Sequence, residues 1–118
     1  MDFTFEKLNT WQKARTLVNH IYTVTKTFPT DERFGLTSQL RRSAVSVASN
    51  LAEGCARRTS RDRAHFATMA YSSLMEALNQ CIIAHDLHYL DESNYAAIRR
   101  QANELGRQIN NLRLKYEE

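Results

Sequence analysis

The chain has 118 residues, with one proline and three glycines, so we expect residues 1–118 to form a single domain. Apolar residues make up 42% and charged residues 25% of the chain, with a formal net charge of +3, and this composition excludes disordered and low-complexity proteins. No segment approaches the roughly 20 apolar residues of a membrane span, so we expect no membrane partner.

The first predicted helix begins after Leu8 and ends before Pro29, because a proline and the residue before it both disfavour helical geometry. Its apolar residues recur three or four positions apart, as on one helix face. They are Trp11, Ala14, Leu17 or Val18, Ile21 and Val24. Thr30 then offers an N-cap for a second helix, which we expect to be irregular near Gly35.

The second and third predicted helices are separated by a short polar segment after Gly54. The second has one apolar face, made of Leu36, Leu40, Ala44, Val47 and Leu51. The third begins at a Ser60 cap and continues to about Leu90. Its apolar positions form a face wider than one seam, which favours self-association of the chain. They are Phe66, Ala70, Leu74, Ala77, Leu78, Cys81 and Ile82.

The fourth predicted helix is capped by Asp91 or Ser93 and carries an unbroken heptad seam. The seam consists of Tyr95, Ile98, Ala102, Leu105, Ile109, Leu112 and Tyr116. No segment has the alternating pattern of a strand. Four helices with short connections predict an all-α fold, an antiparallel up-and-down four-helix bundle with left-handed crossings.

Polar residues line a second side of two of these helices. The second helix has Arg42, Ser46, Asn50 and Glu53 at helical spacing, and the third has Ser73, Glu76 and Gln80. We interpret Ser46, Asn50, Glu53, Ser73 and Glu76 as a structural polar network that fixes the register of two packed helices. An acid/base pair of Glu53 and Glu76 is the less favoured interpretation, because paired carboxylates without a cleft are weak evidence of catalysis.

Arginines concentrate around the segment that joins the second and third helices. Six arginines between residues 41 and 63 are balanced by only two acidic residues, Glu53 and Asp62. These arginines are the candidate nucleic-acid contacts. These candidates are Arg41, Arg42, Arg57, Arg58, Arg61 and Arg63. A second group consists of Arg99, Arg100, Arg107 and Arg113. The alternative interpretation is a solvated corner between helices, in which the arginines only form salt bridges.

Other chemistry has little support in the sequence. Cys81, His85 and His88 share one helix side, but no fourth ligand follows, so we expect no metal. The glycines are isolated and the serines lack a nucleophile context, so we expect no cofactor and no catalytic residue. The N-terminus has no apolar run typical of a signal peptide, and Cys55 and Cys81 lie in helical stretches, so we expect a cytoplasmic protein with reduced thiols.

Three segments carry a resemblance to a known family. They are FEKLNTWQKA, then FP followed by ERFGLTSQLRRSAVSVASNLAEG, then SSLMEAL. The chain resembles the bacterial four-helix bundle proteins, which include proteins encoded in intervening sequences of large-subunit ribosomal RNA genes and are similar to accessory proteins of diversity-generating retroelements. Val47 and Ala48 stand where that family often has isoleucine and proline.

The resemblance implies a bundle that assembles into a ring-like homopentamer with a basic surface toward nucleic acid, and it brings no catalytic residues. With the arginines, it leads to the hypothesis of a non-enzymatic, oligomeric nucleic-acid-binding or accessory protein that contacts RNA or DNA phosphates. The alternative is a scaffold that binds a protein partner, such as a polymerase, through exposed helix faces. An enzyme is the third and least favoured hypothesis.

Overall fold

Four long helices account for most of the computed structural model, which describes residues 2–118. They are α1 (Asn9–Thr25), α2 (Leu36–Cys55), α3 (Ser60–Asp86) and α4 (Glu92–Glu117). Two short 3-10 helices, η1 (Thr4–Lys7) and η2 (Thr30–Glu32), precede α1 and α2. No strand occurs in residues 2–118, and the predicted all-α class is confirmed.

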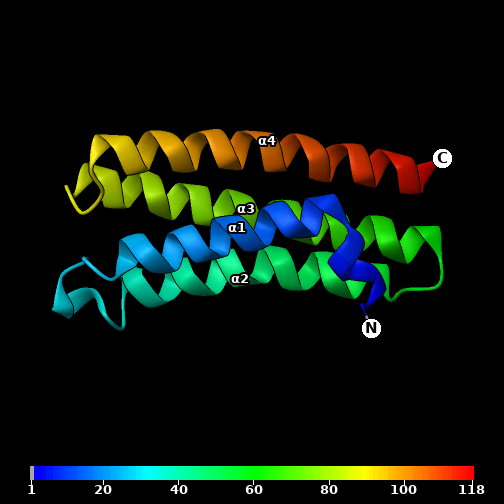
Figure 1. Ribbon diagram of the computed structural model, residues 1–118, viewed down its shortest axis with the longest axis horizontal. Coiled ribbons are helices and arrows are strands. Elements are labelled where there is room, and N and C mark those ends of the chain that lie inside the picture. Colours follow the sequence, from blue (N-terminus) through cyan, green and yellow to red (C-terminus); the bar gives the residue numbers. More distant parts are fainter. Residues whose placement is uncertain (1) are drawn as a thin grey trace.

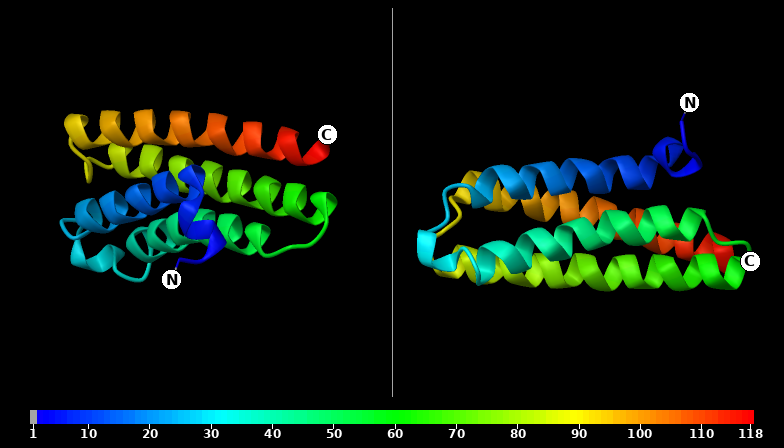
Figure 2. Two further views of the ribbon diagram at one scale, coloured as in Figure 1. Left: turned by 45° about the vertical axis from the view of Figure 1, so that its right-hand side comes forward. Right: turned by 90° about the horizontal axis from the view of Figure 1, so that it is seen from below.

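The helices lie side by side along one long axis, and Figure 1 shows that the chain reverses direction at each connection. Helices α1 and α3 each contact both α2 and α4, and within the described residues the two diagonal pairs make no backbone contact. The contact between α2 and α3 is the most extensive. Both views in Figure 2 show the same elongated bundle, which measures 43 × 26 × 22 Å. The four-helix bundle is confirmed, whereas the left-handed crossing remains a prediction.

The predicted apolar faces meet in the core of this bundle. Every helix contributes side chains that are at most 2% exposed, for example Ile21, Leu40, Leu74 and Ile98. Each such side chain stabilises the fold by about 1.5–3 kcal/mol relative to an exposed position. Among residues 2–118, no helix combines the length and the apolar character that crossing a membrane requires.

The segment between α1 and α2 differs from the sequence prediction. Thr30 begins only the short helix η2, and α2 starts six residues later, at Leu36. The carboxylate of Glu32 takes over the capping role, because its Oε1 accepts a hydrogen bond from the backbone N–H of Leu36 at 3.2 Å. Its other oxygen accepts from the Tyr89 hydroxyl at 3.1 Å, which ties this segment to the α3–α4 connection.

The ends of α3 and the start of α4 are fixed by local hydrogen bonds. Thr59 rather than Ser60 caps α3, since its Oγ1 accepts from the backbone of Asp62 at 3.1 Å. Asp91 caps α4 by accepting from a backbone N–H at 2.7 Å, one of the two predicted possibilities. Helix α3 ends at Asp86, earlier than predicted, because His88 adopts a left-handed φ of 65° that reverses the chain.

Candidate nucleic-acid interface

The two polar stripes face each other where α2 packs on α3. The hydroxyls of Ser46 and Ser73 lie 2.9 Å apart, and the side-chain amide of Asn50 donates to the Ser46 hydroxyl at 3.2 Å and to the Ser46 carbonyl at 2.9 Å. Asn50 is 7% exposed. These three residues therefore link the helices by short polar contacts at a defined register.

A second contact across α2 and α3 involves a residue that the sequence analysis missed. The Ser43 hydroxyl donates to Oε1 of Gln80 at 2.7 Å, and both side chains are buried. A signal was present, because Ser43 stands three residues before Ser46 and seven before Asn50, on the same side of the helix. Its neighbours Arg42 and Ala44 belong to the polar stripe and to the apolar face, and Ser43 lies between these two sides of the helix.

The two carboxylates assigned to this network are outside it. Glu53 and Glu76 are exposed, and neither makes a hydrogen bond or an ion pair with any other part of residues 2–118. The prediction that Glu53 and Glu76 belong to the polar network is wrong. A carboxylate keeps its solvation when a small rotation of the helix leaves it at the surface, so neither residue is drawn into the contact. The polar part of the α2–α3 contact consists of hydroxyl and amide groups.

The arginine cluster of the sequence divides into two separate groups. Arg41 packs against α1, where its Nε donates to the Thr25 hydroxyl at 2.8 Å and its guanidinium lies 4.7 Å from the centroid of the Tyr22 ring. Arg42 is exposed. From Arg42 to the end of α2 at Cys55 the helix rises about 20 Å, so these two arginines are remote from those that follow α2.

The remaining four candidates form what we call the arginine corner, residues Arg57, Arg58, Arg61 and Arg63 at the α2–α3 connection. The guanidinium of Arg57 lies 4.5 Å from the centroid of the Phe66 ring, and Nε of Arg63 donates to the Arg57 carbonyl at 2.8 Å. Arg58 and Arg61 are exposed. The corner lies at the end of the bundle where both chain termini also lie (Figure 1).

The charge of these arginines is not cancelled by carboxylates in residues 2–118. Within residues 2–118, only Lys13 and Arg113 among the lysines and arginines form ion pairs, with Glu104 and Glu117. Aromatic rings, a hydroxyl and a carbonyl orient the side chains of Arg41, Arg57 and Arg63. A guanidinium fixed by such partners keeps its remaining donors and its full charge for an anion.

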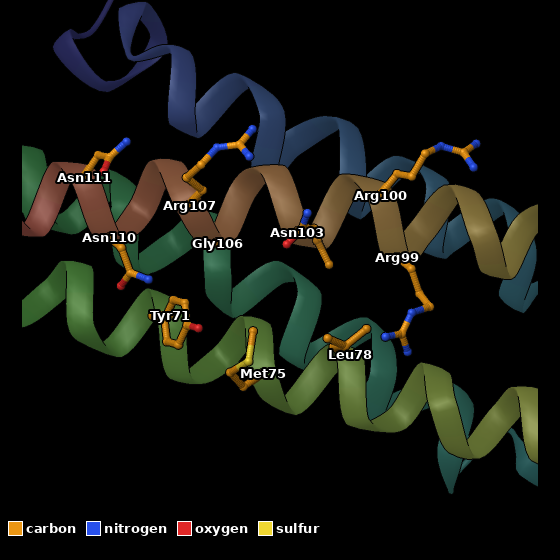
Figure 3. Close-up of a pocket in the computed structure, with 11 residues that line it drawn as sticks. Tyr71, Met75, Leu78, Arg99, Arg100, Asn103, Gly106, Arg107, Asn110 and Asn111 are labelled. Carbon is orange, nitrogen blue, oxygen red and sulfur yellow. The ribbon is translucent and has the colours of Figure 1, made fainter.

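A third basic feature is a groove of about 620 Å³ between α3 and α4, which we call the α3–α4 groove (Figure 3). Arginines and asparagines of α4 line one wall, and apolar side chains of α3 line the other. The residues used below are Arg99, Asn103, Arg107, Asn110, Tyr71 and Met75. The arginines of α4 stand out less in the sequence, because they are spread along the helix and the opposite wall of the groove comes from another element.

The three residues considered as metal ligands, Cys81, His85 and His88, do not converge. Cys81 is buried in the core, where burial raises the pKa of its thiol to about 12. The His85 ring stacks on Tyr95 with centroids 3.8 Å apart and its Nε2 lies 2.6 Å from Oε1 of Glu92, while His88 is exposed. In the described part of the chain, no three His, Cys, Asp or Glu residues are arranged as a metal site.

Comparison with known proteins places the chain in a family. The family model described as 23S rRNA-intervening sequence protein matches residues 6–111. The chain belongs to this family. The match to the 23S rRNA-intervening sequence family begins in η1 and extends into α4, so it includes the arginine corner and the whole α3–α4 groove.

A solved structure has the same fold. The crystal structure of a protein of unknown function from the S23 ribosomal protein family of Bacteroides thetaiotaomicron VPI-5482 is similar with a TM-score of 0.78. It shares 17% sequence identity with this chain, covering 85% of this chain and 94% of that one, so the likeness concerns the fold alone. No curated protein matches the chain.

Proposed function

We propose that this protein is a non-enzymatic accessory protein that binds the phosphates of RNA or DNA through the arginine corner and works as a cytoplasmic homo-oligomer. The observation that carries the proposal is the clustering of four arginines at the corner, none of which pairs with a carboxylate within residues 2–118, while neutral partners orient Arg57 and Arg63. Orienting a guanidinium before binding reduces the entropy lost on contact with a phosphate. The family's name links it to a ribosomal RNA gene, which agrees with a nucleic-acid ligand.

A homo-oligomer compensates for the small charge of one chain. The formal net charge is only +3, so one copy attracts a nucleic acid weakly at long range. Repeating the corner around a ring, a pentamer by the family resemblance, raises the local charge and lets several copies contact one nucleic-acid chain. Native mass spectrometry tests this part of the proposal, and a monomer at micromolar concentration contradicts it.

The salt dependence of binding tests the contact residues. We expect the affinity for duplex DNA and for a structured RNA to fall steeply between about 50 and 200 mM salt, because each phosphate contact releases counterions. Replacing Arg57, Arg58 and Arg61 with glutamine removes three contacts per chain and lowers the slope of log K against log salt by about three for DNA. Fluorescence anisotropy across a salt series measures both quantities.

A variant of equal charge provides the control. Arg15, Lys26 and Arg33 lie on α1 or in the α1–α2 connection, outside the corner, and their triple replacement with glutamine removes the same charge. We expect this control to reduce the salt slope much less than the corner variant. Equal effects of the two triple variants contradict a contact at the corner, and absence of binding at low salt contradicts the proposed function.

Exposed apolar side chains favour a second candidate, a scaffold for a protein partner such as a polymerase. Val45 is 39% exposed beside a groove of about 270 Å³ between α1 and α2, which is lined largely by small and apolar residues. On α3, Ile83 is 42% exposed. Such surface is typical of contacts between proteins. Capture of a partner that survives nuclease treatment, and is lost in a Val45→Lys variant, supports this candidate over nucleic-acid binding.

A further inference from the structure

The α3–α4 groove is basic on one wall and has no acidic residue in its lining. Arg99, Arg100 and Arg107 are exposed, and none of them forms an ion pair within residues 2–118. The guanidinium of Arg99 is oriented by a hydrogen bond to the Tyr95 hydroxyl at 2.9 Å, and Figure 3 shows that it extends toward α3. Arg100 and Arg107 extend to the other side of α4. Positive charge therefore occurs both across the groove and along its rim.

The groove also offers amide groups that the fold does not use. Asn103 is exposed and Asn110 half-buried, and neither side chain makes a hydrogen bond to another part of residues 2–118. Figure 3 shows Asn110 extending from α4 toward α3. An asparagine amide carries donors and an acceptor together, which is the combination that pairs with the edge of a nucleic-acid base. Phosphate binding alone has no need of the acceptor.

The opposite wall is apolar and includes an aromatic ring. Tyr71 and Met75 of α3 face α4 in Figure 3, and Met75 is 36% exposed. The Tyr71 ring lies beside Gly106 of α4, where an added Cβ atom would be in ordinary van der Waals contact with it at 3.5 Å. Flat apolar walls of this kind accept the face of an unpaired base, because every base has a π-face that stacks without sequence preference.

These three properties point to one class of ligand. In a duplex the faces of the bases are stacked and their Watson–Crick edges are paired, so Tyr71 would have no base face to contact and Asn110 could reach only the edges open in a groove. Between Arg99 and Asn110, which both extend toward α3 in Figure 3, the helix rises about 16 Å, which accommodates about five stacked nucleotides at roughly 3.4 Å each. We infer that the α3–α4 groove binds a short stretch of unpaired nucleotides, with arginines on the phosphates, asparagines on the base edges and Tyr71 on a base face. The inference rests on the proposed function and gives it a second site with a different preference.

A neutral substitution separates base contacts from electrostatic attraction. Asn103→Ala with Asn110→Ala changes no charge, and we expect it to weaken binding of a short oligouridine by about tenfold, the loss of two ordinary hydrogen bonds. The salt slope and the affinity for a duplex of the same length stay unchanged. The same measurement with oligodeoxythymidine shows whether the groove prefers single-stranded RNA or single-stranded DNA. Fluorescence anisotropy with a labelled strand gives all these values.

Matched variants control for folding and for general loss of polarity. Asn19 and Asn79 are exposed on α1 and α3 outside the groove, and their double replacement with alanine should leave the affinity for the strand unchanged. Tyr71→Phe keeps the ring and should bind like the wild type, whereas Tyr71→Leu should lose about tenfold, as expected for one base stack. A thermal melt of each variant verifies that the bundle is intact.

Three results overturn the inference. Equal loss of single-strand and duplex affinity in the Asn103/Asn110 variant, or no loss of either, contradicts base contacts in the groove. A change in solution mass of that variant assigns the groove to contact between copies of the chain. If the wild type binds the duplex through the corner while the groove variants keep full affinity for the strand, only this inference fails. Absence of all binding removes the proposed function as well.

Discussion

Replacing Ser43 with alanine removes the donor of the most deeply buried polar contact between α2 and α3. Ser43 is 2% and Gln80 6% exposed, and their 2.7 Å hydrogen bond is inaccessible to water on the serine side. The variant leaves Oε1 of Gln80 without this donor, which costs about 1–3 kcal/mol of unfolding free energy. Alanine recovers about 0.5 kcal/mol through its better helix propensity. We expect a net loss of about 1.5 kcal/mol.

This loss corresponds to a measurable fall in melting temperature. Unfolding entropy is about 2.1 cal/mol/K per residue, so a chain of 118 residues loses about 4 °C per kcal/mol, or about 6 °C for Ser43→Ala. Circular dichroism during heating and in urea, at one fixed protein concentration, measures the change. Ser72 is exposed within α3, and Ser72→Ala serves as the matched control that reports helix propensity alone.

A double variant gives the result that refutes the reasoning. Ser43→Ala combined with Gln80→Leu replaces both polar partners with apolar groups, and we expect it to be more stable than Ser43→Ala alone. If Ser43→Ala melts like Ser72→Ala, the hydrogen bond does not stabilise the bundle. If the double variant is less stable than the sum of the two single variants, the cost came from packing rather than from an unpaired oxygen.

Three further predictions concern reactivity, pH and capping. Burial raises the pKa of Cys81 to about 12. We therefore expect a thiol reagent at neutral pH to label the half-buried Cys55 slowly and Cys81 only upon unfolding. Rapid labelling of both thiols contradicts the packing of the core. The hydrogen bond and charge of Lys13 lower the pKa of Glu104, so this pair stabilises the fold above the ordinary glutamate pKa and ceases to do so as pH falls through the lowered value. Glu104→Gln should therefore narrow the difference in urea midpoint between neutral and acidic pH, and an unchanged difference refutes the assignment. Asp91→Ala removes the cap of α4 and should cost about 1 kcal/mol in urea unfolding, whereas Asp91→Ser should retain most of the stability.

The helical period predicted the core well, because burial of one face repeats every 3.6 residues and is a property of each helix alone. Leu40 and Ile98, for example, occupy the predicted faces and are fully buried. Helix ends were less predictable. Thr59 and Ser60 are adjacent and both suit a cap, and only the backbone geometry selects Thr59. The early end of α3 depends on the positive φ of His88, and a histidine in the sequence does not indicate such a backbone conformation.

The candidate site was harder to predict, because it depends on distance between helices. Arg42 and Arg57 are close in the sequence, yet most of the length of α2 separates them. The α3–α4 groove combines Tyr71 with Asn110, two residues that no local pattern connects. Whether Glu53 faces a neighbour or solvent depends on the exact rotation of α2, which a pattern of spacings defines only to within about one residue.

Both ends of the described chain lie at the end of the bundle that carries the arginine corner, while the α3–α4 groove lies along its side (Figures 1 and 3). Tyr116, near the last residue, even shares a pocket with Arg63. A protein tethered to a sensor surface through either terminus therefore presents the groove freely and holds the corner against the support. On tethered protein we therefore expect binding of unpaired strands at the groove to be detected and binding at the corner to be reduced. Measurements in free solution leave both basic sites accessible.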